Sequence, residues 1–115
     1  MFITRTPYRL SLYGGGLDYQ SWYSNKNTRI LCAGLNYFCY LTVRELPPFF
    51  DHNYKISYSK IETVKDLNNI NHPTAREVIR KYGNGRKIEV SHIGDLPARS
   101  GIGSSSAFTV GLISS

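Results

Sequence analysis

Acidic residues are scarce in this sequence, and long apolar runs are missing from it. Eight Asp and Glu residues stand against fourteen Lys and Arg residues, which gives a formal net charge of +6. Nucleic acid, anionic lipid and phosphorylated metabolites all suit such a balance. Hydrophobic residues make up 41% of the chain and charged residues 19%, which excludes a disordered protein. A length of 115 residues allows one domain and excludes two ordinary ones.

Cysteine is also rare, with Cys32 and Cys39 as the two examples. No further pair of Cys or His residues completes a metal-ligand set around them, so both are predicted to be buried thiols. The longest apolar stretch, residues 30–43, is interrupted by Asn36 and falls short of the ~20 residues of a membrane span. The first residues lack the pattern of a secretion signal. These features predict a cytoplasmic protein with no membrane partner.

Apolar periodicity predicts the secondary structure of most of the chain. Period-two alternation indicates strands, and a stripe at helical spacing indicates a helix. The predicted strands cover residues 2–13, 29–46 (as one or two strands), 54–59 and 87–93, and the helices follow residues 73 and 103. Residues 18–27 are expected to be a loop. This order predicts an α+β domain with a mostly antiparallel sheet.

The first predicted helix carries signals at both ends. Thr74 and Glu77 have the spacing of a capping box, in which each side chain bonds a free backbone amide of the first turn. Gly83 follows the last apolar position and is expected to form a left-handed C-cap.

A glycine-serine segment carries the strongest functional signal. Residues 96–107 read LPARSGIGSSSA and lie between a predicted strand and a predicted helix. Glycines let the backbone approach an anion, and the helix start directs free amides and a positive dipole end to the same point. Serine hydroxyls add donors or a ligand for Mg²⁺. The candidate phosphate-binding residues are Gly101, Ile102, Gly103, Ser104, Ser105 and Ser106, with Ser105 as the candidate Mg²⁺ ligand.

This segment is not a P-loop, because no lysine follows Gly103. From Pro97 to Ala107 it resembles, position for position, the second motif of GHMP kinases, P-x-x-x-G-[LI]-G-S-S-x-A. The alternative without a ligand is a serine-rich helix cap after a glycine turn, with a purely structural role. The register of the proline and the alanine, and the flanking strand and helix, favour the kinase interpretation.

Residues 6–19, TPYRLSLYGGGLDY, resemble the first motif of the same family. In family members this segment approaches the substrate. Arg9 on the polar face of its strand can hold a phosphate, the glycines leave room for a ring, and Asp18 can accept hydrogen bonds from hydroxyl groups. The residues that the resemblance assigns to substrate binding are Arg9, Gly15, Gly16, Asp18 and Tyr19.

The resemblance implies a fold and a reaction. The fold is the GHMP-kinase N-terminal domain, a two-layer arrangement shared with a ribosomal protein domain. The GGG-x-D ending of the first motif is most similar to D-glycero-D-manno-heptose 7-phosphate kinases. These transfer the γ-phosphate of ATP, with Mg²⁺, to the anomeric hydroxyl of a sugar phosphate. Leu17 stands where threonine is common, which removes one hydroxyl near the sugar and leaves the exact substrate open. Another sugar 1-kinase of the family, of the fucose type, is the alternative.

The resemblance covers the N-terminal part of such an enzyme. Residues 1–115 are expected to be part of the ATP-binding domain, truncated before the C-terminal domain. The catalytic base and an acidic Mg²⁺ ligand are expected beyond residue 115, so these residues alone are expected to be inactive.

A small basic nucleic-acid-binding module is the alternative from another functional class. The net charge of +6 and nine tyrosines support it. The basic residues are scattered, however, and no RNP-type aromatic motif is present. The sequence therefore predicts ATP and a sugar phosphate as partners, and no nucleic acid.

Overall fold

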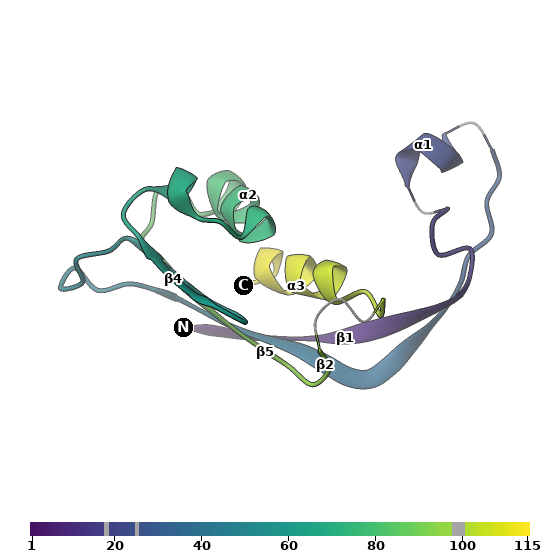
Figure 1. Ribbon diagram of the computed structural model, residues 1–115, viewed down its shortest axis with the longest axis horizontal. Helices are drawn as coiled ribbons and strands as arrows, with labels where there is room; N and C mark the ends of the chain where they lie inside the picture. The colour runs from purple at the N-terminus through teal and green to yellow at the C-terminus, as the bar shows by residue number, and fades with distance from the viewer. Residues whose placement is uncertain (18, 25, 98–100) are drawn as a thin grey trace.

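Five strands form one sheet, in the order β1-β2-β5-β3-β4. The structure is a computed structural model, and it describes residues 1–17, 19–24, 26–97 and 101–115. Helices α2 and α3 lie side by side on one face of the sheet, which makes a two-layer α+β fold (Figure 1). All neighbouring strands are antiparallel except β3 and β5, which are parallel. The predicted fold class, with a mostly antiparallel sheet, is confirmed.

A long hairpin of β1 (Phe2–Tyr13) and β2 (Leu31–Glu45) forms one edge of the sheet. Residues 29–46 therefore contain one strand. The register shifts between the pairs Pro7–Phe38 and Arg9–Gly34, because three residues of β2 face one residue of β1 there. This bulge changes the course of the hairpin next to the residues of the first motif.

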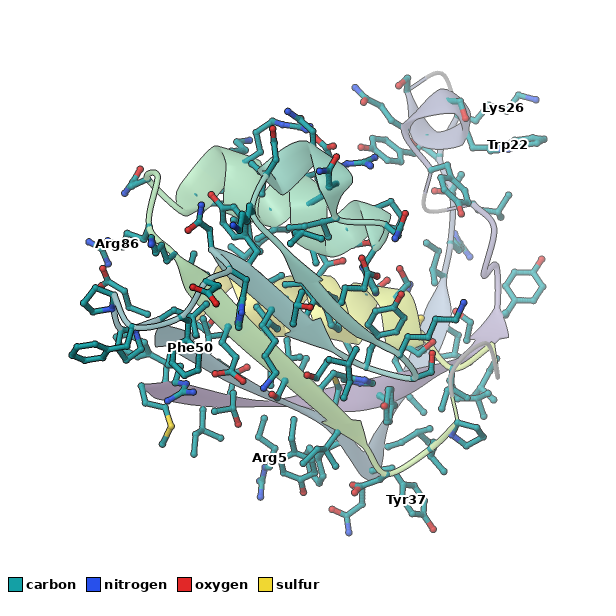
Figure 2. The ribbon with its side chains drawn as sticks, turned by 60° about the vertical axis from the view of Figure 1, so that its left-hand side comes forward. Arg5, Trp22, Lys26, Tyr37, Phe50 and Arg86 are labelled. Atoms are coloured by element: carbon teal, nitrogen blue, oxygen red, sulfur yellow. The ribbon has the colours of Figure 1, made fainter. Side chains whose placement is uncertain are left out.

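A short helix, α1 (Gln20–Tyr23), corrects the expectation of a loop over residues 18–27. It lies beyond the hairpin end, away from α2 and α3 (Figure 1). Trp22 and Lys26 point away from the body of the protein (Figure 2). Trp22 is 52% exposed, and the ammonium of Lys26 lies 6.0 Å from the centre of its ring. Four residues give too weak a periodic signal for a helix to be read from sequence.

The segment predicted as a strand over residues 54–59 is the first half of a tight hairpin. Strand β3 (Tyr54–Ser57) pairs with β4 (Ile61–Val64), and the amide of Tyr58 donates to the carbonyl of Lys60 across the turn, at 2.8 Å. Strand β4 was missed by the sequence interpretation. A 3-10 turn, η1 (Leu67–Asn69), then leads to α2.

Helix α2 (Pro73–Tyr82) begins one residue earlier than predicted. His72 is its N-cap, and its Nδ1 accepts a hydrogen bond from the amide of Ala75 at 3.2 Å. The Thr74–Glu77 capping box is therefore wrong, because Thr74 is already within the helix and Pro73 occupies the first turn. Gly83 is also not a left-handed cap, since its φ is −73°. Within the described residues, no helix is long and apolar enough to cross a membrane.

The core lies between the sheet and the two helices. Leu41 on β2, Val90 on β5 (Ile88–Gly94) and Ile56 on β3 are fully buried. Phe108 and Leu112 of helix α3 (Ser104–Ile113), which packs on β1 and β2, belong to the same buried cluster. These side chains come from distant parts of the sequence, so closing the core also fixes the start of α3 relative to β1.

Gly111 sets how closely α3 approaches the sheet. A Cβ atom at this position would lie 3.0 Å from Cδ1 of Leu41, 3.0 Å from Oγ1 of Thr6 and 3.1 Å from Oγ1 of Thr4. The hydroxyl of Thr4 also donates to the carbonyl of Gly111 at 3.1 Å. The helix axis can lie this near β1 and β2 only because residue 111 has no side chain.

Candidate phosphate-binding site

The glycine-serine segment turns directly into α3. Gly103 is the N-cap of the helix, with φ 74° and ψ 27°, and Gly101 also has φ 74°. Both lie in the left-handed region, which glycine adopts without the steric cost that a side chain brings. Because the N-cap is a glycine, it has no side chain of its own that could bond the first amides of α3. The first amides of the helix therefore remain available to an anion, and the helix dipole adds partial positive charge there.

Strand β1 holds this turn in place. The amide of Arg9 donates to the carbonyl of Ile102, with 3.1 Å between nitrogen and oxygen. The side chain of Arg9 then passes close to Gly103, where an added Cβ would lie 3.0 Å from its Cγ and 3.3 Å from its Nε. β1 is an edge strand of the sheet, so its outer edge is available for this contact with the turn.

The two predicted motifs meet in one cavity. It has a volume of about 440 Å³ and is lined by Arg9, Ser11, Gly15, Gly101, Gly103, Ser104 and Ser105. Three of these residues come from the N-terminal segment and four from the glycine-serine segment. The lining combines a guanidinium, serine hydroxyls and the open start of a ten-residue helix. Such donors suit the oxygens of a phosphate chain.

Other predicted site residues lie outside this lining. Ile102 contributes its carbonyl to the contact with Arg9, and Ser106 is exposed in the first turn of α3. Gly16 lies in the turn after β1, and Tyr19 is 68% exposed as the N-cap of α1. Asp18 lies outside the described residues, as do positions 98–100 of the second motif.

Ser105 remains the candidate for the Mg²⁺ ligand. It lines the cavity from the first turn of α3, and its carbonyl accepts a hydrogen bond from the hydroxyl of Thr109 at 2.8 Å. A serine hydroxyl beside bound phosphates fits a hard cation that prefers oxygen. The described part of the chain contains no group of three or more His, Cys, Asp or Glu residues arranged as a metal site.

Two residues at the cavity were missed by the sequence interpretation. Ser11 lines it, and Cys32 lies next to Ser11, with 3.3 Å between Sγ and Oγ. Nη1 of Arg9 also donates to Sγ of Cys32, at 3.6 Å. Ser11 could have been found, because residues two apart on a strand share a face. Cys32 could not, since its place depends on the register of β2; it is exposed, so the prediction that it is buried was wrong.

Tyr8, the residue before Arg9, belongs to the core of the fold. Tyr8 is 1% exposed, and burial is the main cause that raises the pKa of its hydroxyl, with smaller effects from Cys39 and Asp95. Its hydroxyl contacts Gly94 so closely that a Cβ there would lie 2.5 Å away. Tyr8 therefore packs in the core, where Cys39 is also fully buried as predicted.

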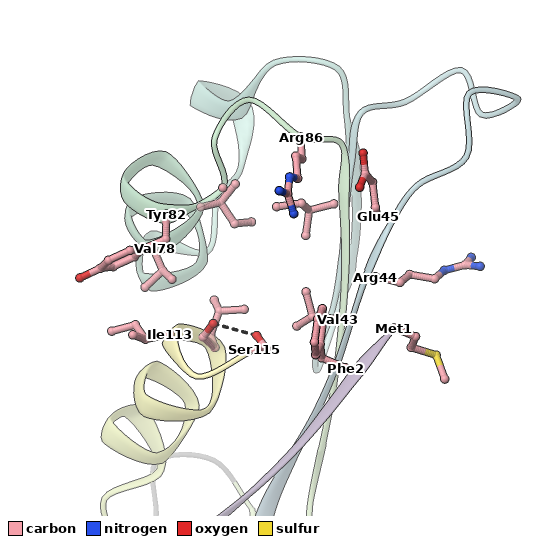
Figure 3. Close-up of a pocket in the computed structure, with 14 residues that line it drawn as sticks. Met1, Phe2, Val43, Arg44, Glu45, Val78, Tyr82, Arg86, Ile113 and Ser115 are labelled. Atoms are coloured by element: carbon pink, nitrogen blue, oxygen red, sulfur yellow. Dashed lines mark hydrogen bonds between the residues drawn. The ribbon is translucent and has the colours of Figure 1, made fainter.

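A second cavity, of about 320 Å³, lies at the far end of α3 from the glycine-serine turn. Figure 3 shows it between the ends of α2 and α3 and the strands, with Phe2, Val43, Val78 and Ile113 among its apolar lining. The hydroxyl of Ser115 donates to the carbonyl of Leu112 at its edge, at 2.8 Å. Its apolar lining and the C-terminal end of α3 make it a poor place for a phosphate.

Part of the sequence matches a known family. Residues 68–115 match the family model described as the GHMP kinases N terminal domain. This range includes the glycine-serine turn and α3, and it leaves out the segment of the first motif. Among curated proteins, none matches the chain.

Solved kinases share the fold over almost all of the chain. The D-glycero-D-manno-heptose 1-phosphate kinase of Bacteriodes thetaiotaomicron has 24% identity and a TM-score of 0.73, covering 96% of this chain and 39% of that one. The mevalonate kinase of Methanococcus jannaschii has 18% identity and a TM-score of 0.67, covering 97% of this chain and 38% of that one. These likenesses show that the chain has the fold of these kinases, and the match of residues 68–115 identifies it as the fold of the GHMP-kinase N-terminal domain. The chain spans less than two fifths of either kinase.

Proposed function

We propose that this chain forms the phosphate-binding part of an ATP-dependent small-molecule kinase. One observation carries the proposal: the tertiary structure brings the residues of two separate motifs to one cavity at the N-terminus of α3. The donors there suit a triphosphate, and the family match of residues 68–115 covers the turn that supplies most of them.

Each group that lines the cavity has its own proposed role in binding. The turn at Gly101 and Gly103 lets the phosphate chain approach the backbone, and the first amides of α3 bind its oxygens. Arg9, which lies beside the turn, offsets the negative charge of the phosphates. We propose that the hydroxyl of Ser105 ligates Mg²⁺. When bound, this ion would neutralise negative charge on the phosphates.

The proposed acceptor is a sugar phosphate, D-glycero-D-manno-heptose 7-phosphate. The acceptor's anomeric oxygen bonds to the γ-phosphorus, the bond from that phosphorus to ADP breaks, and the hydroxyl proton passes to a base outside residues 1–115. The GGG-x-D ending of the first motif and the fold of the heptose kinase support this choice. Leu17 stands where threonine is common in the motif and leaves the exact sugar open, so a fucose-type sugar 1-kinase is kept as the second candidate.

Thermal unfolding tests the ATP site directly. The chain is heated with MgATP, with MgCl₂ alone, and with single-stranded RNA at matched ionic strength. A ligand at about 100 times its Kd adds about 2.7 kcal/mol to the free energy of unfolding, so the midpoint with MgATP should rise. A rise with RNA and none with MgATP would favour the nucleic-acid-binding alternative.

A turnover assay tests the proposal that residues 1–115 hold the phosphate-binding part of the active site and that the base lies outside them. We expect residues 1–115 to bind MgATP without phosphorylating heptose 7-phosphate, because the base is proposed to lie outside them. Release of ADP coupled to sugar phosphorylation by the purified chain would contradict this expectation.

A further inference from the structure

The chain between β5 and α3 is attached to the sheet at two points. Near the start of α3, the carbonyl of Ile102 accepts a hydrogen bond from the amide of Arg9 on β1, at 3.1 Å. Directly after β5, the amide of Asp95 donates to the carbonyl of Phe38 on β2 at 3.0 Å. Oδ2 of Asp95 also accepts from the amide of Phe38, at 2.8 Å. The glycine-serine turn therefore has one attachment on each strand of the β1–β2 hairpin.

The side chain of Asp95 takes the place of a backbone acceptor. In a regular antiparallel ladder, two opposed residues exchange two backbone hydrogen bonds. Phe38 and Asp95 exchange one backbone bond, and the carboxylate supplies the acceptor for the other. The regular pairing of β2 with β5 ends one residue earlier, at Cys39 and Gly94. The carboxylate thus satisfies the last amide of the ladder while the backbone of residue 95 leaves the sheet.

The two attachment points lie on either side of the bulge in the hairpin. Phe38 belongs to the last pair of β1 and β2 before the bulge, and Arg9 belongs to the first pair after it. Tyr8, the residue of β1 at the bulge, is buried, and its hydroxyl would lie 2.5 Å from a Cβ atom added at Gly94. The end of β5 is therefore held by Tyr8 on β1 as well as by Phe38 on β2.

We propose that Asp95 is a positioning residue for the anion site, the cavity at the N-terminus of α3. By holding the amide of Phe38, its carboxylate fixes the point at which the chain leaves the sheet. This reduces the number of conformations open to the turn that presents Gly103 and the first amides of α3 to a phosphate chain. Asp95 is not among the described residues that line the cavity, so it acts through the turn. The inference rests on the proposed phosphate-binding function.

Calorimetric titration with inorganic tripolyphosphate in MgCl₂ tests the role. We expect Asp95→Ala to weaken binding by about threefold to tenfold, because the hydrogen bond that fixes the turn is lost. The loss of a negative charge alone would act in the opposite direction, since it favours an anion. Asp95→Asn also removes the charge but keeps an oxygen that can accept from the amide of Phe38. It should bind at least as tightly as the unaltered chain.

Asp66 offers a matched control. Its Oδ1 accepts from the amide of Asn68 at 2.8 Å, which is a bond of the same kind and length, but it caps η1 ahead of α2. Both aspartates are exposed, so both alanine variants should fold, and urea unfolding should show similar small losses of stability. Asp66→Ala should bind tripolyphosphate as the unaltered chain does. An equal loss of affinity in the two variants would contradict a positioning role.

Hydrogen exchange of the Arg9 amide reports on the turn itself. This amide bonds to the carbonyl of Ile102 at the outer edge of β1, so it should exchange faster when the turn is held less firmly. We expect an increase of about threefold to tenfold in Asp95→Ala and none in Asp95→Asn or Asp66→Ala. Amides of β5, the central strand, serve as the reference for global unfolding. Equal acceleration at Arg9 and along β5 would indicate a general loss of stability and would count against the proposal.

The outcomes separate this inference from the proposed function. No tripolyphosphate binding by the unaltered chain would overturn the phosphate site and, with it, the role of Asp95. Tripolyphosphate binding that Asp95→Ala leaves unchanged, or that Asp95→Asn weakens to the same extent, would overturn the role of Asp95 alone.

Discussion

The backbone of Arg9 is hydrogen-bonded to the backbone of Ile102, at 3.1 Å from N–H nitrogen to carbonyl oxygen. This bond joins the edge strand of the sheet to the turn that begins α3. The side chain of Arg9 extends past Gly103 on its way to the cavity. The anion site therefore depends on the packing of α3 against β1 as much as on the motif residues themselves.

Gly103→Ala should abolish most of the binding of MgATP. The new methyl group would lie 3.0 Å from Cγ of Arg9, and φ 74° is unfavourable for alanine. We expect at least a tenfold rise in Kd, which corresponds to about 1.4 kcal/mol. Titration calorimetry measures it.

Gly85→Ala is the matched control for this variant. Gly85 has φ 73° and open space at its Cβ position, so it shares the backbone strain of Gly103 without the contact to Arg9. It should lose about 1 kcal/mol of stability and keep its affinity. Equal loss of affinity in both variants would show that strain, not the contact at the cavity, explains the result.

Gly111→Val should loosen the packing of α3 on the sheet. Its side chain would meet Leu41, Thr6 and Thr4 at about 3 Å, and overpacking of this kind costs about 1–3 kcal/mol. Urea unfolding gives the difference. Gly34→Val, on a strand with open space at the Cβ position, should show no comparable loss; a loss of the same size there would point to a general cost of removing glycine.

Glu89→Gln should destabilise the sheet at neutral pH. Glu89 is 8% exposed and lies between Lys55 and Arg44 on the neighbouring strands, with 2.8 Å from Nζ of Lys55 to Oε1. The hydrogen bond from Lys55, followed by that from Arg44, lowers the pKa of this carboxyl although burial opposes the shift. Loss of a buried, charge-assisted partner costs about 1–3 kcal/mol.

The sign of the pH dependence follows from the lowered pKa of Glu89. The stability that ionised Glu89 contributes is complete above its unfolded pKa of 4.5. This stability is lost as the pH falls through the lower pKa of the folded state. Unfolding of Glu89→Gln should therefore differ from the unaltered chain at pH 7 and converge with it in strong acid. Glu77→Gln is the control, because Glu77 also contacts two arginines but has a side chain that is 57% exposed, and it should change stability little.

His72 should make the fold less stable in mild acid. Burial lowers the pKa of its ring, although the Glu62 carboxylate opposes the shift, and its Nδ1 caps α2 in the unprotonated state. The ring also packs against Tyr58 and Phe108, and Phe108 makes an edge-on contact with His92. Burial, then the charge of His72, lowers the pKa of His92 as well.

Because both folded pKa values are lowered, the unfolded chain takes up protons first as the pH falls below 6.5. The free energy of unfolding should therefore be highest above pH 6.5 and decline through the lowered folded values. Urea unfolding between pH 8 and pH 5 measures this loss. His72→Asn keeps a capping acceptor without the titrating ring, so its loss should be smaller but not zero, since His92 remains. An identical loss in both proteins would exclude His72 as a source.

The sequence by itself determined the class of fold and the turn that binds phosphate in our proposal. Alternation marked β1 and β5, and the glycines at 101 and 103 marked a turn that no other residue adopts easily, because these signals are local. The cap of α2 was misread because a histidine nitrogen replaced the usual hydroxyl, and β4 was missed because a four-residue strand leaves little pattern.

Only the tertiary structure decided which residues share the cavity. The packing of α3 on β1, allowed by Gly111, brought Gly103 to Arg9, and the register of the hairpin brought Cys32 to the same guanidinium. Neither contact has a local signature, because each joins residues that are far apart in the chain and depends on the core that forms between them.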